Sequence, residues 1–279
     1  MIDIRSISAD LILGEDEIWY TLNDQKVSYP SNGNENTFTV EDDSFWFKHR
    51  NSCIASLVTS YPPEDNGTIF DIGGGNGFVS AGLAKVGFDV ALVEPGRTGV
   101  FNAKGRGLKN IICSTISAAK FKQHSLPAVG VFDVIEHVED DLSFLKSIRG
   151  LMKKGGRLYV TVPSYSFLWS EEDVLAGHFR RYTLKDISSV LMSAGFELEF
   201  SSYIFRFLPV PIYLLRSLPY KIGLQTLERK PSNITRDHAV KAGITAKILS
   251  SILQQELENL KNMKSMSFGS SCILVARNR

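Results

Sequence analysis

Short apolar runs alternate with longer amphipathic stretches over most of this chain. Apolar runs of roughly four to eight residues between turn residues are typical of buried strands, and stretches with a period of about 3.6 residues predict helices. Strands are expected at 68–72, 89–94, 110–113, 128–133, 157–163, 196–205 and 270–276, and helices at 78–86, 97–105, 141–153 and 184–194. This alternation predicts an α/β fold, a doubly wound and mostly parallel sheet covered by helices on both faces.

Capping residues mark the ends of one further predicted helix and of the helix predicted at 184–194. Asp43 or Ser44 is expected to cap a helix that continues to about Tyr61, where two prolines follow. The segment Thr183–Asp186 has the spacing of a capping box, and Gly195 provides the matching stop for the helix that starts there.

The residues before this regular core, 1–42, are interpreted as an N-terminal elaboration. A hairpin is expected there, with arms at 17–22 and 26–29, followed by a polar loop at 31–36. The main domain is expected to cover 43–279.

A helical insertion is expected at 206–265, before the last strand. Residues 241–263 have the period of an amphipathic helix. The segment 203–222 is apolar, contains three prolines, and carries only cations as charged residues, namely Arg206, Arg216 and Lys221. One interpretation is a peripheral membrane contact or a lipid-like substrate. The other is a lid that packs on the edge of the sheet or on a second copy, with the prolines shortening any helix.

The segment Asp71–Gly77, with the sequence DIGGGNG, is the most informative part of the chain because it directly follows a predicted strand and precedes a predicted helix. Glycines let the backbone turn sharply and approach a ligand closely, and the start of the helix offers free N–H groups to an anion. A phosphate-binding loop would end in Gly-Lys-Ser/Thr, but Gly77 is followed by Phe78. A dinucleotide site would require a third glycine where Phe78 stands. A tight turn without any ligand is the remaining alternative.

A second acid, Glu94, ends the next predicted strand, 23 residues after Asp71. A carboxylate at that place can accept hydrogen bonds from both hydroxyls of a ribose. The carboxyl ends of adjacent parallel strands meet at one edge of the sheet, which is where ligands bind in open α/β sheets. Taken alone, Glu94 would be a solvated charge at the end of a strand.

From about Phe45 to its C-terminus the chain resembles a class I S-adenosylmethionine-dependent methyltransferase of the small-molecule type, similar to quinone-biosynthesis O-methyltransferases. The most specific stretches are Phe70–Gly77, Val93–Pro95, Phe132–Val138 and His178–Thr183. The resemblance implies the seven-stranded Rossmann-like methyltransferase fold, with the closing strand inserted antiparallel between the fifth and sixth strands. It also implies S-adenosylmethionine as the cofactor.

The same resemblance implies particular roles for individual residues. Asp71 is expected to hold the ammonium group of the cofactor and Glu94 its ribose. The acid that often contacts adenine after the third strand has no match here, so Thr115 or a backbone carbonyl is expected to take its place. The full set of cofactor-binding residues implied is Asp71, Gly73, Gly74, Gly75, Asn76, Gly77, Glu94, Pro95, Thr115, Phe132 and Asp133.

The segment Asp133–His137 follows the fourth strand and is expected next to the transferred methyl group. His178 follows the fifth strand and can approach from the other side of the cleft. The candidate catalytic residues are His137, Glu136 and His178. In one hypothesis His137 or His178 is a general base or only an orienting group, and the acids are structural. In a second hypothesis these three residues and Asp133 hold a divalent ion that polarises a substrate hydroxyl, as the Glu-x-x-Glu-His segment of similar O-methyltransferases suggests. A third interpretation gives Glu136 and His137 only a structural role, as a cap and a brace.

Two adjacent arginines, Arg180 and Arg181, have two interpretations. They bind an anionic group of the substrate, or they pair with the acids at 171–173.

The composition narrows the class of partner. The formal net charge is +1, so no nucleic-acid partner is expected. Three widely spaced cysteines, Cys53, Cys113 and Cys272, are expected to be reduced and buried, and the polar start of the chain does not resemble a secretion signal. The prediction is therefore a cytoplasmic methyltransferase that acts on a small or lipid-like acceptor, at oxygen. The alternatives are a protein that binds the cofactor without catalysis, or an NAD-dependent enzyme. The sequence does not specify the oligomeric state.

Overall fold

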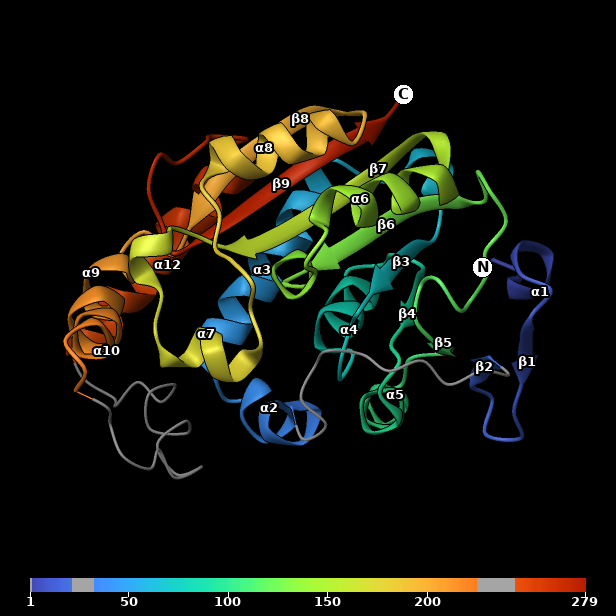
Figure 1. Ribbon diagram of the computed structural model, residues 1–279, viewed down its shortest axis with the longest axis horizontal. Coiled ribbons are helices and arrows are strands. Elements are labelled where there is room, and N and C mark those ends of the chain that lie inside the picture. The colour runs from blue at the N-terminus through green and yellow to red at the C-terminus, as the bar shows by residue number, and fades with distance from the viewer. Residues whose placement is uncertain (1, 22–32, 225–243) are drawn as a thin grey trace.

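The computed structural model describes residues 2–21, 33–224 and 244–279 (Figure 1). These residues contain one sheet of nine strands in the order β1-β2-β5-β4-β3-β6-β7-β9-β8. The strands are β1 (Leu11–Leu13), β2 (Trp19–Thr21), β3 (Ile69–Ile72), β4 (Val90–Val93), β5 (Asn110–Cys113), β6 (Leu126–Phe132), β7 (Met152–Pro163), β8 (Phe196–Ile204) and β9 (Ser271–Asn278). All seven predicted strands are present, and β1 and β2 extend the sheet beyond them.

Helices cover both faces of the sheet, as the alternation of elements predicts (Figure 1). The α-helices are α1 (Ile4–Ile7), α2 (Gly33–Glu41), α3 (Phe45–Ser60), α4 (Phe78–Lys85), α5 (Arg97–Gly105), α6 (Asp141–Leu151), α7 (Glu171–Ala176), α8 (Leu184–Ser193), α9 (Pro209–Ile212), α10 (Leu218–Lys221) and α12 (Ile244–Lys261). Shorter helical turns are η1 (Glu64–Asn66), η2 (Ile135–His137), η3 (Ser166–Leu168) and η4 (Tyr213–Ser217). Helices α3, α4 and α12 pack on one face, and α1, α6 and α8 pack on the other.

The strands that carry the site are buried on both sides. In β3, Ile69 contributes to the core under α3 and α4, whereas Phe70 and Ile72 contribute to the core under α6 and α8. This is the alternation expected of a pleated strand between two helical layers. The strand β9 runs antiparallel between β7 and β8, so the expected position of the closing strand is confirmed.

The predicted helix signals are also confirmed. The Ser44 side chain accepts hydrogen bonds from the backbone N–H groups of Trp46 and Phe47 at the start of α3. A capping box formed by Thr183 and Asp186 starts α8. The three cysteines are buried and free, as expected.

The N-terminal region differs from the prediction. Strand β2 pairs with β1, which precedes it, and also runs parallel to β5, while the expected arm at 26–29 lies outside the described residues. Helix α2 begins at Gly33, inside the segment expected to be a polar loop. The pairing of β2 covers the outer edge of β5, which would otherwise expose unpaired backbone groups. The division into 1–42 and 43–279 stays a prediction.

Candidate active site

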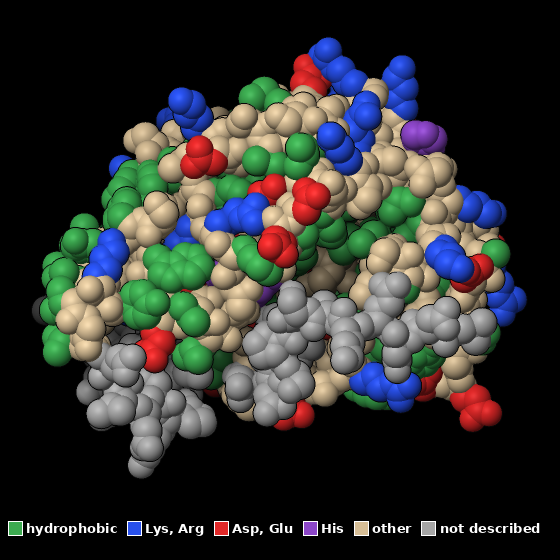
Figure 2. Space-filling model, viewed as in Figure 1, with side chains coloured by type: hydrophobic (Ala, Val, Ile, Leu, Met, Phe, Trp, Pro, Cys, Tyr) green, Lys and Arg blue, Asp and Glu red, His purple; other side chains and the backbone are tan. Residues whose placement is uncertain are grey.

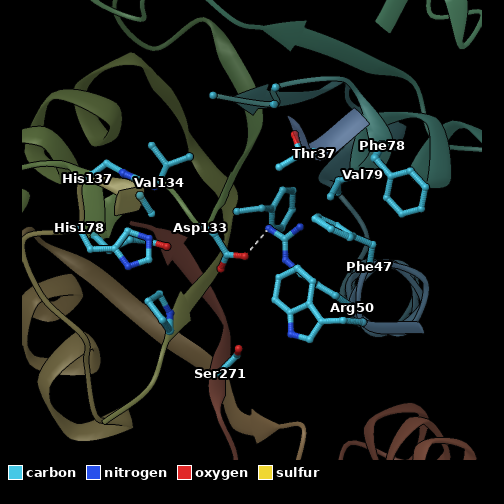
Figure 3. A pocket seen from close by; sticks show the side chains of 18 of the residues that line it. Thr37, Phe47, Arg50, Phe78, Val79, Asp133, Val134, His137, His178 and Ser271 are labelled. Carbon is cyan, nitrogen blue, oxygen red and sulfur yellow. Dashed lines mark ion pairs between the residues drawn. The ribbon is translucent and has the colours of Figure 1, made fainter. Parts of the chain in front are cut away.

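A cavity of about 830 Å³ opens at the carboxyl ends of β3, β4, β6 and β7 (Figure 3). Its volume falls within the range of about 300–1,000 Å³ that is typical of small-molecule sites, and its position at this edge of a doubly wound sheet is the usual one for ligands. The predicted site residues that line it are Asp71, Gly73, Gly74, Gly75, Asn76, Glu94, Pro95, Thr115, Phe132, Asp133, Glu136, His137 and His178.

Gly77 is the one predicted site residue that lies outside the lining of the cavity. It has a φ of 73°, and a Cβ placed on it would come within 2.8 Å of side-chain atoms of Ala103 and Leu108. Gly77 therefore provides the close packing between the loop and α5.

The glycine loop has little space for side chains. Gly73 and Gly75 have φ values of 69° and 54°, in the left-handed region that favours glycine. A Cβ on Gly74 would overlap the Leu92 side chain and lie 2.8 Å from Oδ2 of Asp71. The loop therefore holds the backbone close to Asp71 and leaves its cavity side open to a ligand.

Asp71 is fully buried at the end of β3. Its Oδ2 accepts a hydrogen bond of 2.6 Å from the Ser80 hydroxyl, while its Oδ1 is buried without a hydrogen-bond partner. Burial raises the pKa of Asp71 to about 6, although Ser80 and Arg50 act in the opposite direction. A buried carboxylate oxygen without a donor is costly, so this oxygen is suited to a cationic hydrogen-bond donor from a ligand.

Glu94 lies at the other side of the loop and is 6% exposed. Its Oε2 accepts from the backbone N–H of Gly75 at 3.0 Å, and its Oε1 accepts from the backbone N–H of Gly96 at 2.7 Å. Each carboxylate oxygen has two acceptor positions, so Glu94 can brace the loop and still accept hydrogen bonds from two ligand hydroxyls. Asp71 and Glu94 thus share one cavity.

Thr115 is placed at the cavity beyond β5, where the sequence suggested it for the adenine. Its hydroxyl accepts from the backbone N–H of Ala118 at 3.1 Å and lies 3.1 Å from the hydroxyl of Ser117. These contacts give the hydroxyl a local capping role. The neighbouring Ile116 also lines the cavity and provides an apolar contact there.

Arg50 is a site residue that the sequence did not reveal. It projects from α3 into the cavity, is 7% exposed, and pairs with Oδ2 of Asp133 at 2.7 Å (Figure 3). Its guanidinium also lies 5.4 Å from the centre of the Trp46 ring, and Thr161 donates to the other oxygen of Asp133. Arg50 lies in a polar part of α3, between His49 and Asn51, so no local pattern marks it as a site residue, and its partner is distant in sequence.

His137 and His178 lie on the other side of the cavity from Arg50 (Figure 3). Glu136 also lines the cavity and forms a group with these two histidines. One potential ligand atom from each lies within 4.8 Å of the others, and the two imidazole rings are 4.7 Å apart. Burial and the nearby Asp133 raise the pKa of Glu136 well above its ordinary value, and its Oε2 is buried without a hydrogen-bond partner. Burial and the neighbouring His178 lower the pKa of His137 to about 4, so its imidazole is neutral at neutral pH.

Asp173, on α7, orients His178 and was not singled out from the sequence. Its Oδ1 lies 2.8 Å from Nδ1 of His178 and accepts from Nε of Arg181 at 2.7 Å. Burial opposes ionisation of Asp173, but hydrogen bonds from His178 and Arg181 outweigh it and lower the pKa of Asp173. An ionised Asp173 accepts a hydrogen bond from the Nδ1–H of His178, which leaves the lone pair of a neutral imidazole on Nε2.

These contacts bear on the earlier alternatives. Asp133 is held by Arg50 and Thr161, whereas Glu136, His137 and His178 each bring one potential ligand atom into a common group. The two arginines pair with acids, but with different ones. Arg181 pairs with Asp173, within the expected segment, whereas Arg180 pairs with Asp141 at 2.9 Å.

The chain matches known methyltransferases over much of its length. Residues 46–199 match the model of a family described as a methyltransferase domain. A ubiquinone biosynthesis O-methyltransferase from Caulobacter vibrioides is 30% identical over 104 residues, which are 35% of this chain and 41% of that protein. The chain therefore spans less than half the length of this curated relative.

Solved structures show the same fold. An S-adenosylmethionine-dependent methyltransferase from Thermotoga maritima superposes with a TM-score of 0.54 at 18% identity, covering 90% of this chain and 100% of that chain. A phosphoethanolamine N-methyltransferase from Haemonchus contortus, solved with S-adenosylmethionine, gives 0.53 at 17% identity and covers 90% and 58% of the two chains. Within the described residues, no helix is long and apolar enough to cross a membrane.

Proposed function

This chain belongs to the methyltransferase-domain family, and from that premise we propose that it is an enzyme that binds S-adenosylmethionine and transfers the methyl group to a hydroxyl oxygen of a small or lipid-like acceptor. The cofactor proposal is supported above all by the two carboxylates that face one cavity across the glycine loop. Asp71 offers a buried, unpartnered oxygen to the ammonium group of the cofactor, and Glu94 offers acceptor positions to the ribose hydroxyls.

The reaction itself is an in-line displacement. The acceptor oxygen forms a bond to the methyl carbon while the bond from that carbon to the sulfonium sulfur breaks, and the sulfur leaves as a neutral thioether. The acceptor hydroxyl loses its proton to a base. The protein must therefore hold the two reactants at near-attack distance and provide that base.

His178 is our candidate for the base. The buried Asp173 binds the Nδ1 side of the ring, which directs the lone pair at Nε2 towards a proton donor, and it stabilises the imidazolium that forms. His137 is less suited to that role because burial lowers its pKa to about 4. Burial and the nearby Asp133 raise the pKa of Glu136, which favours its protonated form, and that form can donate a hydrogen bond in the same cavity.

The acceptor side of the cavity is mostly apolar, which supports an acceptor with an apolar body. Its lining includes Phe45, Trp46, Leu208, Ile212 and Leu215. The polar lining includes the histidines, the Arg50–Asp133 pair and, beside Leu215, the Arg216–Glu172 pair. This distribution suits an amphiphilic acceptor whose reactive hydroxyl points to His178 and whose apolar part lies towards the helical insertion.

A divalent ion is the alternative way to activate the hydroxyl. Glu136, His137 and His178 fit as ligands because they bring one carboxylate and two imidazoles within 4.8 Å, and because an oxygen of Glu136 is buried without a partner. Such an ion would act as a Lewis acid on the acceptor oxygen. Methyl transfer measured with and without a chelator decides between the two, since unchanged turnover would exclude the ion.

The first experiment is calorimetric titration with S-adenosylmethionine, with its demethylated product, and with NAD. We expect the first two to bind and NAD not to bind. Binding of NAD alone would refute the proposal. Binding of S-adenosylmethionine without transfer to any of a panel of phenols and alcohols, short-chain and long-chain, would favour the alternative of a binding protein without catalysis.

The second experiment addresses the base. In His178→Ala we expect kcat to fall by about 10²- to 10⁴-fold with unchanged cofactor affinity, because general-base catalysis contributes about that much. His124→Ala is the matched control, because His124 bonds the backbone of Met152 away from the cavity. In Asp173→Asn the pH profile of kcat should shift, which a residue with only a structural role would not cause.

A further inference from the structure

The helical insertion exposes an unusually apolar surface next to the cavity. We define the insertion face as the exposed side chains Val210, Leu214, Leu215, Tyr220, Ile222 and Leu224, which come from α9, η4, α10 and the turn that follows. Their exposed fractions are between 40% and 73%. Figure 2 shows hydrophobic side chains gathered at the left end of the molecule, where Figure 1 places α9 and α10. Apolar surface of this kind marks a contact with a partner or a membrane when it is contiguous.

The insertion face is continuous with the candidate active site. Leu215 is 73% exposed and also lines the cavity, and its neighbours Leu208, Pro211 and Ile212 line the cavity as well. Phe167, which is 40% exposed, extends the apolar surface, since its ring lies 6.1 Å from that of Tyr213 on η4. The mouth of the cavity is therefore formed in part by residues of the same apolar surface.

Within the described part of the segment that forms this face, the charged side chains are all cations. No acidic residue occurs between Phe200 and Leu224, whereas Arg206 and Lys221 are exposed there. Arg216 pairs with Glu172 on α7, which leaves the other two cations to define the local charge. The ammonium of Lys221 lies 5.4 Å from the ring centre of Tyr213 and donates to the backbone carbonyl of Phe167 at 3.0 Å, so this cation borders the apolar surface directly.

We propose that the insertion face docks on a bilayer surface that contains anionic lipids, and that it thereby places the mouth of the cavity against the membrane. An apolar surface bordered by cations is the pattern that binds such an interface, with the apolar side chains entering the headgroup region and the cations meeting lipid phosphates. A second copy of the chain is a poorer occupant. A two-fold contact would place this cationic rim against itself, and the acid beside it, Glu172, is already paired with Arg216.

The consequence for the reaction is a lipid-embedded acceptor that enters the cavity from the bilayer past Leu215. This consequence rests on the proposed methyl transfer, whereas the docking itself does not. The contact is peripheral, because the helical run formed by α9, η4 and α10 extends only from Pro209 to Lys221 and is shorter than the ~20 residues that a membrane-spanning helix needs.

The test is flotation of the purified chain with vesicles of phosphatidylcholine alone or mixed with phosphatidylglycerol. We expect binding to the mixed vesicles that weakens as salt increases. Leu214→Asp/Ile222→Asp should weaken that binding at least tenfold, because neither side chain can then enter the interface. Val86→Asp/Met192→Asp is the matched control, because Val86, directly after α4, and Met192, on α8, are 53% and 56% exposed. This double variant should bind vesicles as the wild type does. Arg206→Glu/Lys221→Glu should weaken binding at least thirtyfold, because each basic residue lost near an anionic surface costs ~1 kcal/mol and each added carboxylate is repelled.

Different results would overturn different proposals. The four substituted positions, 206, 214, 221 and 222, do not line the cavity, so each variant should bind S-adenosylmethionine normally. A wild-type protein that binds S-adenosylmethionine but no vesicles refutes the docking and leaves the proposed function intact. Vesicle binding without cofactor binding refutes the proposed function and leaves the docking intact. A lipid-free dimer that Leu214→Asp/Ile222→Asp dissociates would assign the face to a second copy instead.

Discussion

Replacing Asp71 with asparagine should separate the cofactor affinity from the stability of the fold. In the unliganded protein, burial raises the pKa of Asp71 from 3.8 to about 6. Above about pH 6 the ionised, buried carboxylate lowers the free energy of unfolding. This destabilisation decreases as the pH falls from about 6 towards 4. The difference in pKa corresponds to about 3 kcal/mol.

Asp71→Asn keeps the shape of the side chain and removes its charge. At about pH 8 the variant should unfold with a free energy equal to that of the wild type or higher by up to about 3 kcal/mol. Its affinity for S-adenosylmethionine should fall roughly 10- to 150-fold, because hydrogen bonds to charged groups contribute about 1.5–3 kcal/mol. A variant that is at least as stable but binds the cofactor more weakly is a result that misfolding cannot produce.

The pH dependence provides an independent readout of the same carboxylate. Only the ionised form attracts an ammonium group, so the wild-type affinity should be constant well above pH 6 and should fall about tenfold per pH unit below it. Asp71→Asn should lack this fall. In Ser80→Ala the loss of the hydroxyl that donates to Oδ2 should raise the pKa of Asp71 further and move the midpoint of the profile to higher pH.

The assay is calorimetric titration with S-adenosylmethionine between about pH 5 and pH 8, with urea unfolding of the same samples. Equal affinities of wild type and Asp71→Asn at about pH 8 would refute the assignment of Asp71 to the ammonium. Parallel pH profiles of the two proteins would show that another group carries the titration.

Three further predictions concern the loop, the second carboxylate and the insertion. Gly74→Ala should weaken cofactor binding at least tenfold, because a Cβ has no space there, whereas Gly105→Ala, with nothing within 4 Å of the added atom, should bind normally in the same titration. Glu94→Gln should weaken binding of S-adenosylmethionine by about 1.5–3 kcal/mol and should leave the binding of methionine alone unchanged; an equal loss for both ligands would contradict a ribose contact. Glu256→Gln should lower the free energy of unfolding by about 2–3 kcal/mol, because the buried Glu256 carboxylate accepts hydrogen bonds from two backbone N–H groups and contacts His49. Glu258 is exposed, so Glu258→Gln should change the free energy of unfolding by less than about 0.5 kcal/mol.

The regular core follows from local patterns in the sequence. Each of the seven predicted strands occurs within a few residues of its expected bounds, because apolar runs between turn residues have few other ways to bury their side chains. The carboxyl ends of parallel strands meet at one edge, so the positions of Asp71, Glu94 and Asp133 along the chain already place them at one cavity. The glycine loop was recognisable from the sequence because its backbone conformation depends on its own glycines.

Partner choice within the site was decided only by the tertiary structure. The sequence did not reveal that Asp133 pairs with Arg50, or that Asp173 binds His178 as well as Arg181. Several acids lay close enough in sequence to each basic group, and only the packing of α3 and α7 against the sheet selects among them. The pKa values follow the same rule, because the burial that raises the pKa of Glu136 is a property of the assembled cavity.

The edges of the fold also required the structure. The hairpin of β1 and β2 pairs across the outer edge of β5, a choice that its own sequence does not encode because any open strand edge offers similar hydrogen bonds. The segment 203–222 is apolar in sequence whether it packs inside or faces outwards. The local pattern therefore determined the elements and the acids at their ends, whereas contacts between distant segments determined which charges are paired, which are buried, and which apolar side chains remain exposed.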